Sequence, residues 1–366
     1  MLIDQLRDAL PTFAARDAAD PENYPSQSVA DLYALGVIAS PFAASLGGSN
    51  ATPADGVAII EAMAGASGSL ALIASMPLGL ATVYSLTDEF VPAQHRSDWR
   101  AQVERAAADY RAARVYAAAN SEKGAGGSLA ATKTVAQRGP DGVFRLQGEK
   151  ILATSGRFAH RFFSTAKATQ EDLPGAGIVE FFLVPAHGEG VEIMADWDGF
   201  GMRPTESQTV RYHDAPVECL FGFPNFIEAV QPIPHFTLMF AAIPLGCAGA
   251  ILRELTTPAP QSPALRLRFN EALMRYEALR AYLFETAREL RPASPPAFRA
   301  RVLRTKTYVS QEATKLAAEL FALSGGRSYR RTGTVARAFS DSFAGTALRP
   351  PLSLGLETLS EGFSFE

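Results

Sequence analysis

The sequence has few of the residues that build metal centres and disulfide frameworks. It contains two cysteines in 366 residues, Cys219 and Cys247, without CxxC spacing, and five histidines that form no HxxxH pair. We therefore predict no metal site and reduced thiols, as in an intracellular protein. A net charge of −4 gives no electrostatic basis for binding nucleic acid or an anionic membrane.

Several nucleotide-binding and hydrolytic motifs are also missing. Gly124 and Gly126 match the start of GxGxxG, but Leu129 occupies the third position. The sequence has neither GxxxxGK[ST] nor a GxSxG elbow. A Rossmann dehydrogenase, a Walker-type nucleotidase and a serine hydrolase are therefore disfavoured.

The sequence shows no charged-then-apolar leader, and we expect a cytoplasmic protein without a secretory signal. Two apolar segments need comparison with a membrane span. Glu61 and Pro77 interrupt residues 57–84, whereas residues 236–251 contain Pro244 and are shorter than the ~20 residues of a typical span. We expect both segments to be buried helices.

The hydrophobic period divides the chain into helical, extended and again helical parts. Ile3, Leu6, Leu10 and Phe13 recur at helical spacing, and further helices are predicted up to about residue 112. From about residue 114 short β-branched and aromatic runs alternate with Gly, Pro and Asp turns. The predicted strands are 115–119, 130–137, 143–147, 161–168, 178–184, 191–195 and 208–213.

Three long helical patterns follow this extended part. They cover residues 236–254, 266–290 and 298–324, and Pro244 is expected to kink the first or mark its start. The order predicts an α+β multidomain fold: an N-terminal all-α domain (1–112), a central antiparallel β-barrel domain (113–220) and a C-terminal four-helix bundle (221–366).

A glycine-rich turn stands at the beginning of the extended part. Residues 117–128 read AAANSEKGAGGS. Glycine allows close approach of a ligand to the backbone, and Asn120 and Ser121 supply polar groups beside it. Alone, such a turn is a weak sign of a ligand site.

Further blocks make the chain resemble the acyl-CoA dehydrogenase superfamily over nearly its whole length. SEKGAGGS (Ser121–Ser128) resembles the family's TEPGAGSD-like turn, and GEKILAT (Gly148–Thr154) its GxKxWIT block. GMRPTES (Gly201–Ser207) resembles GMRxTxS, and GGRSYRRTGTVARAFSD (Gly325–Asp341) resembles the last block, GGxGY followed by RD.

The resemblance implies a flavin, FAD or alternatively FMN, between the β-domain and the C-terminal helices, partly across a subunit interface. It places Leu152 and Thr154 over the ring, with the Thr154 hydroxyl near N5 or O4, and Gly325 and Gly326 at the pyrophosphate. The implied cofactor-binding residues are Asn120, Ser121, Gly126, Gly127, Leu152, Thr154, Gly325 and Gly326.

The resemblance fails at the catalytic base. The family's Glu takes the substrate α-proton, but Arg349 stands at that position when residues are counted from Asp341 without gaps. The catalytic residue is therefore unknown from sequence. Glu357 or Glu361 could act as the base only if the loop after Phe343 has a different conformation from that of the family.

Three functions follow from these features. The first is a flavin-dependent oxidoreductase acting on CH–CH bonds of an acyl thioester, with an electron-transfer partner. The second is a two-component flavin monooxygenase that uses O₂ and reduced flavin from a reductase, and the third is a non-catalytic family member. The resemblance implies a homodimer or homotetramer. A small-molecule substrate, such as a CoA thioester, is expected in the first two cases.

Overall fold

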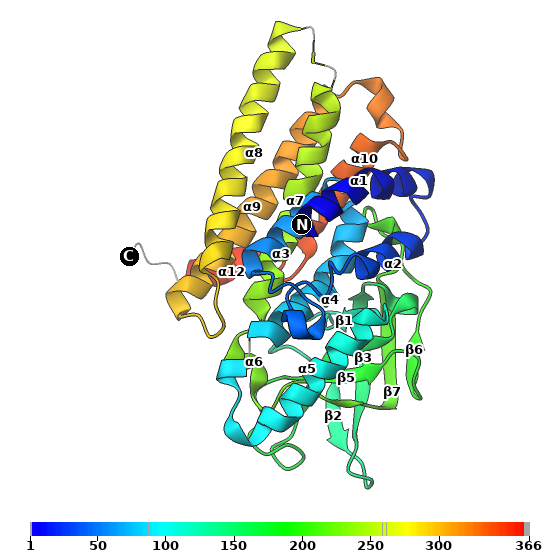
Figure 1. The fold of residues 1–366 in the computed structure, drawn as a ribbon, viewed down its shortest axis with the longest axis vertical. Coiled ribbons are helices and arrows are strands. Elements are labelled where there is room, and N and C mark those ends of the chain that lie inside the picture. The colour runs from blue at the N-terminus through cyan, green and yellow to red at the C-terminus, as the bar shows by residue number, and fades with distance from the viewer. Residues whose placement is uncertain (1, 87, 258, 261, 362–366) are drawn as a thin grey trace.

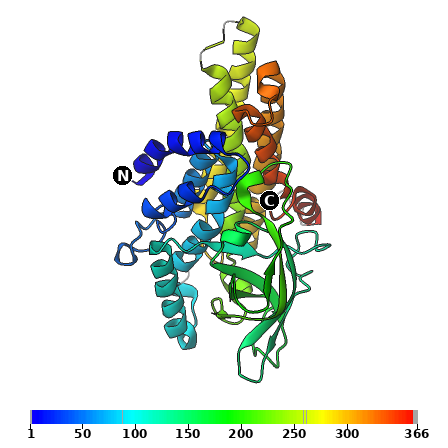
Figure 2. The same ribbon diagram turned by 90° about the vertical axis from the view of Figure 1, so that its right-hand side faces the viewer.

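The computed structural model describes residues 2–86, 88–257, 259–260 and 262–361. Helices begin the chain, a curved sheet follows, and long helices complete it (Figure 1). Figure 2 shows the N-terminal helices beside the sheet and the long C-terminal helices extending beyond both. The N-terminal helices are α1 (Leu2–Ala19), α2 (Ser26–Ala34), α3 (Pro53–Ala64), α4 (Gly68–Leu86) and α5 (Arg96–Arg111).

Helix α4 forms the buried centre of the N-terminal part. Nearly all its side chains are buried. This is expected of a helix whose residues are apolar on every side. Before it, α3 begins at a capping box in which Thr52 and Asp55 satisfy each other's backbone N–H groups. This cap fixes the direction from which α3 approaches α4 and α7 (Ile233–Thr256).

The predicted order of helical, barrel-like and helical parts is confirmed, but the central sheet is an open half-barrel with parallel as well as antiparallel pairs, and not a purely antiparallel barrel. Strand β4 pairs in parallel with β1 and with β2, and the end strands β6 and β8 do not pair with each other. The strands are β1 (Tyr116–Ala119), β2 (Val135–Arg138), β3 (Phe144–Ala153), β4 (Arg161–Ala168), β5 (Glu180–Pro185), β6 (Val191–Ile193), β7 (Gln208–Pro216) and β8 (Cys219–Leu220).

The parallel pairings arise from the glycine-rich segment between β1 and β2. It forms no hairpin, and it carries the chain along β4 so that both strands run in the direction of β4. The strand predicted from residue 130 begins only at Val135. The Glu122 carboxylate accepts the backbone N–H groups of Lys133 and Thr134, which are therefore not available to a strand ladder.

Helix α7 is the centre of the C-terminal part. It packs against α3, α4 and several of the later helices, and Gly246 allows its backbone to approach the Glu61 carbonyl oxygen closely. Pro244 lies inside α7 and contacts Gly345. The remaining helices are α6 (Phe226–Val230), α8 (Pro263–Glu289), α9 (Pro296–Leu323), α10 (Thr334–Ser342), α11 (Ala344–Ala347) and α12 (Leu352–Glu361).

Helices α4 and α7 are long and apolar enough to span a membrane by length and composition. In the structure, 89% of the most apolar α4 window and 94% of the α7 window are buried against other parts of the protein. Both segments act here as core helices.

Candidate functional site

Two neighbouring cavities lie where β1, β3 and the C-terminal helices meet. The first, here called the aromatic cavity, has a volume of about 250 Å³ and includes Phe163, Phe181, Phe236 and Phe240 in its wall. The second, the tryptophan cavity, has a volume of about 230 Å³ and is lined by Trp197 and Phe200. Their shared lining residues are Leu72, Leu152, Thr154, Ala347 and Leu348.

Five of the eight residues predicted to bind a cofactor line the aromatic cavity. They are Asn120, Ser121, Gly127, Leu152 and Thr154. Gly126 belongs to the same turn but lines neither cavity. Gly325 and Gly326 lie between α9 and α10, at the end of the helical region away from the sheet (Figure 1).

Leu152 is held in an uncommon conformation at the site. Its φ is +58°, in the left-handed region that a leucine rarely adopts, and it lies at an irregularity of the pairing between β3 and β7. Its neighbour Ile151 donates a backbone hydrogen bond to the Ser121 carbonyl oxygen. The Leu152 side chain is 52% exposed, and an exposed apolar group beside two cavities suits a surface that a flat ligand covers.

A short chain of hydroxyl groups lies next to Leu152. Thr154 Oγ1 is 3.1 Å from Ser207 Oγ, which is 2.7 Å from Thr205 Oγ1. Thr205 in turn donates to the Met202 carbonyl oxygen. The hydroxyls of Thr154 and Ser207 can therefore act together toward a polar ligand edge.

A buried ion pair fixes the glycine-rich turn to the sheet. Lys150 Nζ lies 2.6 Å from Glu122 Oε1, and it also donates to the Thr165 carbonyl oxygen. Thr134 Oγ1 donates to the same carboxylate oxygen. Because Lys150 lies two residues before Leu152, this ion pair couples the turn to the strand that carries Leu152 and Thr154.

Residues 348–351, here called the strap, join α11 to α12 and close the aromatic cavity from the other side. Arg349 Nη2 donates to the Asn120 carbonyl oxygen over 2.7 Å. Lys306 Nζ, on α9, donates to the carbonyl oxygens of Leu348 and Pro350, on both sides of Arg349. The strap is thus tied to the predicted cofactor turn and to the helical bundle.

Neither cavity has a carboxylate among its described lining residues. Glu357 and Glu361, considered above as replacement bases, lie exposed on α12 and line neither cavity. Arg349, in contrast, lines the aromatic cavity. It stands at the sequence position where the family resemblance places the catalytic base.

Sequence reasoning missed part of the site. Four residues that line the cavities were not predicted as site residues: Trp197, Ser207, Phe236 and Phe240. Ser207 lay within a recognised block, but the two phenylalanines belong to a helix whose apolar residues looked like ordinary core. For Trp197 no motif gave a signal.

Asp341, at the end of α10, lies buried behind the tryptophan cavity. Its Oδ1 accepts the Met202 backbone N–H over 2.6 Å, and burial raises the pKa of its carboxyl to about 7. In the unfolded chain the carboxyl ionises near pH 4, whereas in the folded protein it stays protonated up to about pH 7. Between these pH values the unfolded state is stabilised by ionisation and the folded state is not, so the free energy of unfolding decreases as the pH rises. Stability from this group should therefore fall between about pH 4 and pH 7.

We expect Asp341→Asn to remove this pH dependence. Relative to the wild type, the free energy of unfolding of the variant should rise by about 2 kcal/mol between pH 5 and pH 7, since one pKa unit corresponds to about 1.4 kcal/mol. Urea unfolding at several pH values measures the difference. Parallel pH profiles of the two proteins would contradict the raised pKa.

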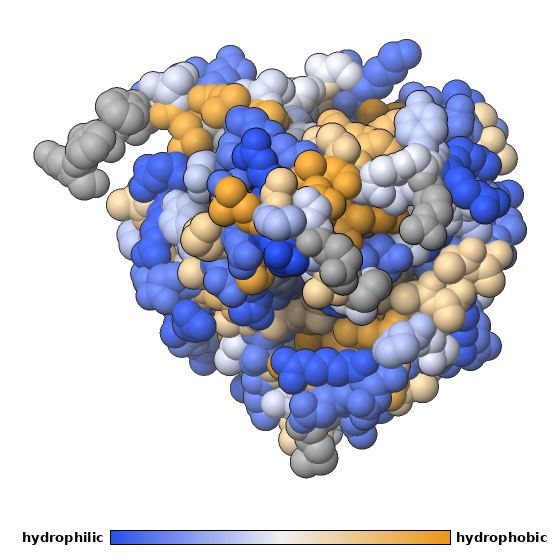
Figure 3. Space-filling view, turned by 90° about the horizontal axis from the view of Figure 1, so that it is seen from above, coloured by the Kyte–Doolittle hydropathy of each residue, from blue (hydrophilic) through white to orange (hydrophobic). Residues whose placement is uncertain are grey.

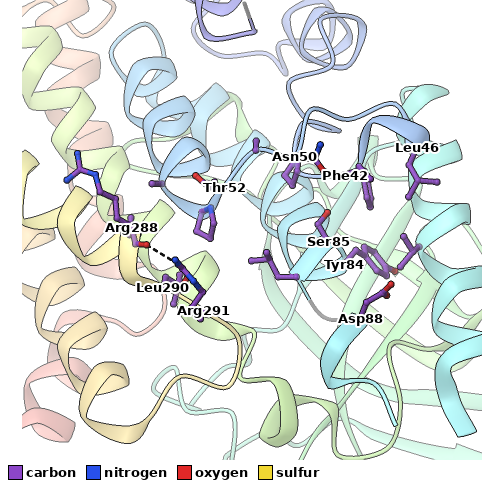
Figure 4. Close-up of a pocket in the computed structure, with 18 residues that line it drawn as sticks. Phe42, Leu46, Asn50, Thr52, Tyr84, Ser85, Asp88, Arg288, Leu290 and Arg291 are labelled. Atoms are coloured by element: carbon purple, nitrogen blue, oxygen red, sulfur yellow. Dashed lines mark hydrogen bonds between the residues drawn. The ribbon is translucent and has the colours of Figure 1, made fainter. Parts of the chain in front are cut away.

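A third cavity, of about 470 Å³, lies apart from the candidate site. Figure 4 shows Phe42, Leu46 and Asn50 on one side of it and Arg288, Leu290 and Arg291 on the other. None of the predicted site residues lines this cavity.

Models of protein families match two segments of the chain. The model described as acyl-CoA dehydrogenase, middle domain, matches residues 117–215, and the one described as acyl-CoA dehydrogenase, C-terminal domain, matches residues 238–348. Together they cover more than half of the chain. The chain belongs to the acyl-CoA dehydrogenase superfamily.

Curated relatives fall into both enzyme branches of this superfamily. A protein described as probable acyl-CoA dehydrogenase YngJ, from Bacillus subtilis, is 23% identical over 337 residues, covering 87% of this chain and 84% of the relative. A dibenzothiophene monooxygenase from Rhodococcus erythropolis is 32% identical over 139 residues, about a third of each chain.

Solved structures with 20% identity or less share the fold over nearly the whole chain. KijD3 in complex with dTDP has a TM-score of 0.83 at 20% identity, covering 99% of this chain and 95% of that one. FMN-bound TdsC from Paenibacillus sp. A11-2 has 0.82 at 19%, covering 98% and 96%. Butyryl-CoA dehydrogenase from Megasphaera elsdenii has 0.82 at 17%, covering 99% and 97%.

Proposed function

We propose that this protein is a flavin-dependent monooxygenase of the two-component kind, which takes reduced flavin from a separate reductase and uses O₂. The observation that carries the proposal is the lack of any carboxylate among the described residues of the two cavities, with Arg349 in place of a base. The partial likeness to dibenzothiophene monooxygenase supports the same branch.

The residues at the cavities fit a flavin. The exposed Leu152 side chain offers an apolar face, and the paired hydroxyls of Thr154 and Ser207 offer a polar edge beside it. Ser121 and Gly127 of the glycine-rich turn line the aromatic cavity beside these groups. We propose FMN or FAD as the cofactor.

When bound, the flavin supplies the redox chemistry, whereas the protein binds and orients. Thr154 and Ser207 would hold the polar edge of the ring, with each hydrogen bond worth ~1 kcal/mol net. The phenylalanines of the aromatic cavity exclude water from the substrate. In this arrangement no protein carboxylate is needed to remove a proton from carbon.

Dehydrogenation of an acyl thioester is the second candidate. It is favoured by the match to the probable acyl-CoA dehydrogenase over most of the chain. That reaction needs a positioned base, which contributes about 10²–10⁴-fold to the rate. The second candidate therefore requires α12 to move so that Glu357 or Glu361 enters the site.

We expect butyryl-CoA to leave the flavin-loaded protein yellow under anaerobic conditions, with any bleaching at least ~100-fold slower than for a dehydrogenase with its base. With indole, NADH, a flavin reductase and air, we expect a product one oxygen atom heavier than indole. Absorbance near the flavin bands and mass spectrometry measure the two outcomes. Rapid bleaching by butyryl-CoA would establish the dehydrogenase instead, and a protein that binds no flavin would point to a non-catalytic member.

We also propose that a second copy of the chain completes the assembly. Leu267 and Met274, seven residues apart on α8, are exposed apolar side chains, as is Tyr308 on α9. Figure 3 shows hydrophobic residues gathered in patches among hydrophilic ones at the upper end of the molecule. Pairing of copies through the bundle would bring Gly325 and Gly326 to a partner's cofactor, as the superfamily resemblance implies.

A further inference from the structure

The surroundings of the strap contain more buried positive charge than negative charge. Lys150 and Glu122 form an ion pair, which leaves Arg349 as an additional cation and Lys306 as an additional basic group. Within the described ranges neither of these two forms an ion pair, and the Glu122 carboxylate, already paired with Lys150, acts on Arg349 only from a greater distance. Lys306 is 1% exposed and is held by carbonyl oxygens alone.

The Arg349 guanidinium is incompletely satisfied. Nη2 donates to the Asn120 carbonyl oxygen, whereas Nε and Nη1 are buried and lack a partner among the described residues. Burial lowers the pKa of Arg349 to about 10 and that of Lys306 to about 7. Buried donors without partners are costly, and more so when they carry charge.

The cavity that Arg349 lines supplies no anion of its own. Its wall is mainly apolar, with the four phenylalanines, Leu72 and Met76, and the part of it that the structure describes contains neither Asp nor Glu. A ligand with a negative group would therefore provide the missing counter-charge, while its remaining surface contacts aromatic side chains.

We propose that the substrate of the aromatic cavity is an apolar molecule with a single carboxylate, and that Arg349 selects it by pairing with that carboxylate. This rests on the proposed function, because it names the substrate class for the same site. Arg349 acts as a specificity residue and takes no part in proton removal.

A carboxylate fits this environment better than a phosphate does. The other side-chain hydrogen-bonding groups at the cavity belong to Asn120, Ser121 and Thr154, of which Asn120 Oδ1 already accepts the Thr165 N–H. One guanidinium balances the charge of one carboxylate and matches its two oxygens, whereas a phosphate dianion would keep one negative charge uncompensated against an apolar wall. Lys306 supports this role by holding the strap on both sides of Arg349.

The test compares benzoate with its neutral counterpart benzamide, by isothermal titration of the flavin-reconstituted protein. We expect benzoate to bind at least about 10-fold more tightly, as for a hydrogen bond between charged groups. Arg349→Gln should abolish this preference, and Arg349→Lys should retain part of it. Arg211→Gln, which removes an exposed arginine from the sheet, is the matched control and should leave the preference unchanged.

Equal binding of benzoate and benzamide by the wild type, or binding of neither, overturns the proposal without requiring any variant to fold. A preference that survives in Arg349→Gln overturns it as well. If that variant binds FMN more weakly but riboflavin equally well, the arginine serves the cofactor phosphate, and the proposal is wrong. Bleaching of the flavin by butyryl-CoA is a separate measurement. Its outcome tests the proposed function and not the preference of Arg349 for a carboxylate.

Discussion

Replacing Gly127 with valine is expected to abolish flavin binding. Gly127 has a φ of +90°, and a Cβ added there would lie 2.4 Å from Cδ of Pro351 in the strap. The side chain would push the glycine-rich turn away from the strap, and with it Asn120 and Ser121. Overpacking costs about 1–3 kcal/mol and the left-handed conformation about 1–2 kcal/mol more.

Gly142→Val, in the turn between β2 and β3, is the matched control for this experiment. Gly142 also has a positive φ, +80°, but an added Cβ meets nothing within 4 Å, and Gly142 lines neither cavity. The control therefore carries the same side chain and a similar backbone strain without the collision. We expect at least ~100-fold weaker flavin binding for Gly127→Val and a change below ~10-fold for Gly142→Val, by fluorescence titration. Similar losses in both variants would show that a general loss of stability, and not contact with the strap, weakens flavin binding.

Replacing Lys150 with methionine is expected to destabilise the fold by about 3–5 kcal/mol, because it leaves the buried Glu122 carboxylate without its cation. Both side chains are almost fully buried in this pair. The double variant Glu122→Gln/Lys150→Met should recover most of the loss, since neither charge remains. Urea unfolding of the single and double variants measures the coupling.

An exposed pair on the same strand provides the control. Glu149, next to Lys150, pairs with Arg211 across β3 and β7, and both side chains are well exposed. Glu149→Gln should change the free energy of unfolding by less than about 1 kcal/mol. Equal effects of Lys150→Met and Glu149→Gln would exclude the buried ion pair as the group that holds the turn.

Much of the site could be found from the sequence because it lies in continuous segments. Asn120, Ser121 and Gly127 stand in one turn, and Leu152 and Thr154 stand in one strand, with both segments in the expected order. The structure brings them together through the Lys150–Glu122 pair. The cofactor roles of these residues remain predictions.

Pairing of the strands could not be obtained in the same way. Apolar and polar alternation identifies a strand and its two faces, but it carries no information on which neighbour the strand joins. Strand β2 begins only after Thr134 because the Glu122 carboxylate accepts hydrogen bonds from the backbone N–H groups of Lys133 and Thr134. Strands β1 and β2 are both parallel to β4 because the glycine-rich segment between them runs along β4. Turn signals between short strands had suggested an antiparallel arrangement throughout.

The sequence by itself determined the helix–sheet–helix order and the segments that carry the predicted flavin residues, because local periodicity and glycine positions report on local structure. Only the tertiary structure decided what surrounds Arg349. Counting residues placed an arginine where a base was expected, but Phe236 and Phe240 come from α7, Lys306 from α9 and Asn120 from the turn after β1. The desolvation of a charge depends on all these segments at once, and it arises only when they pack together.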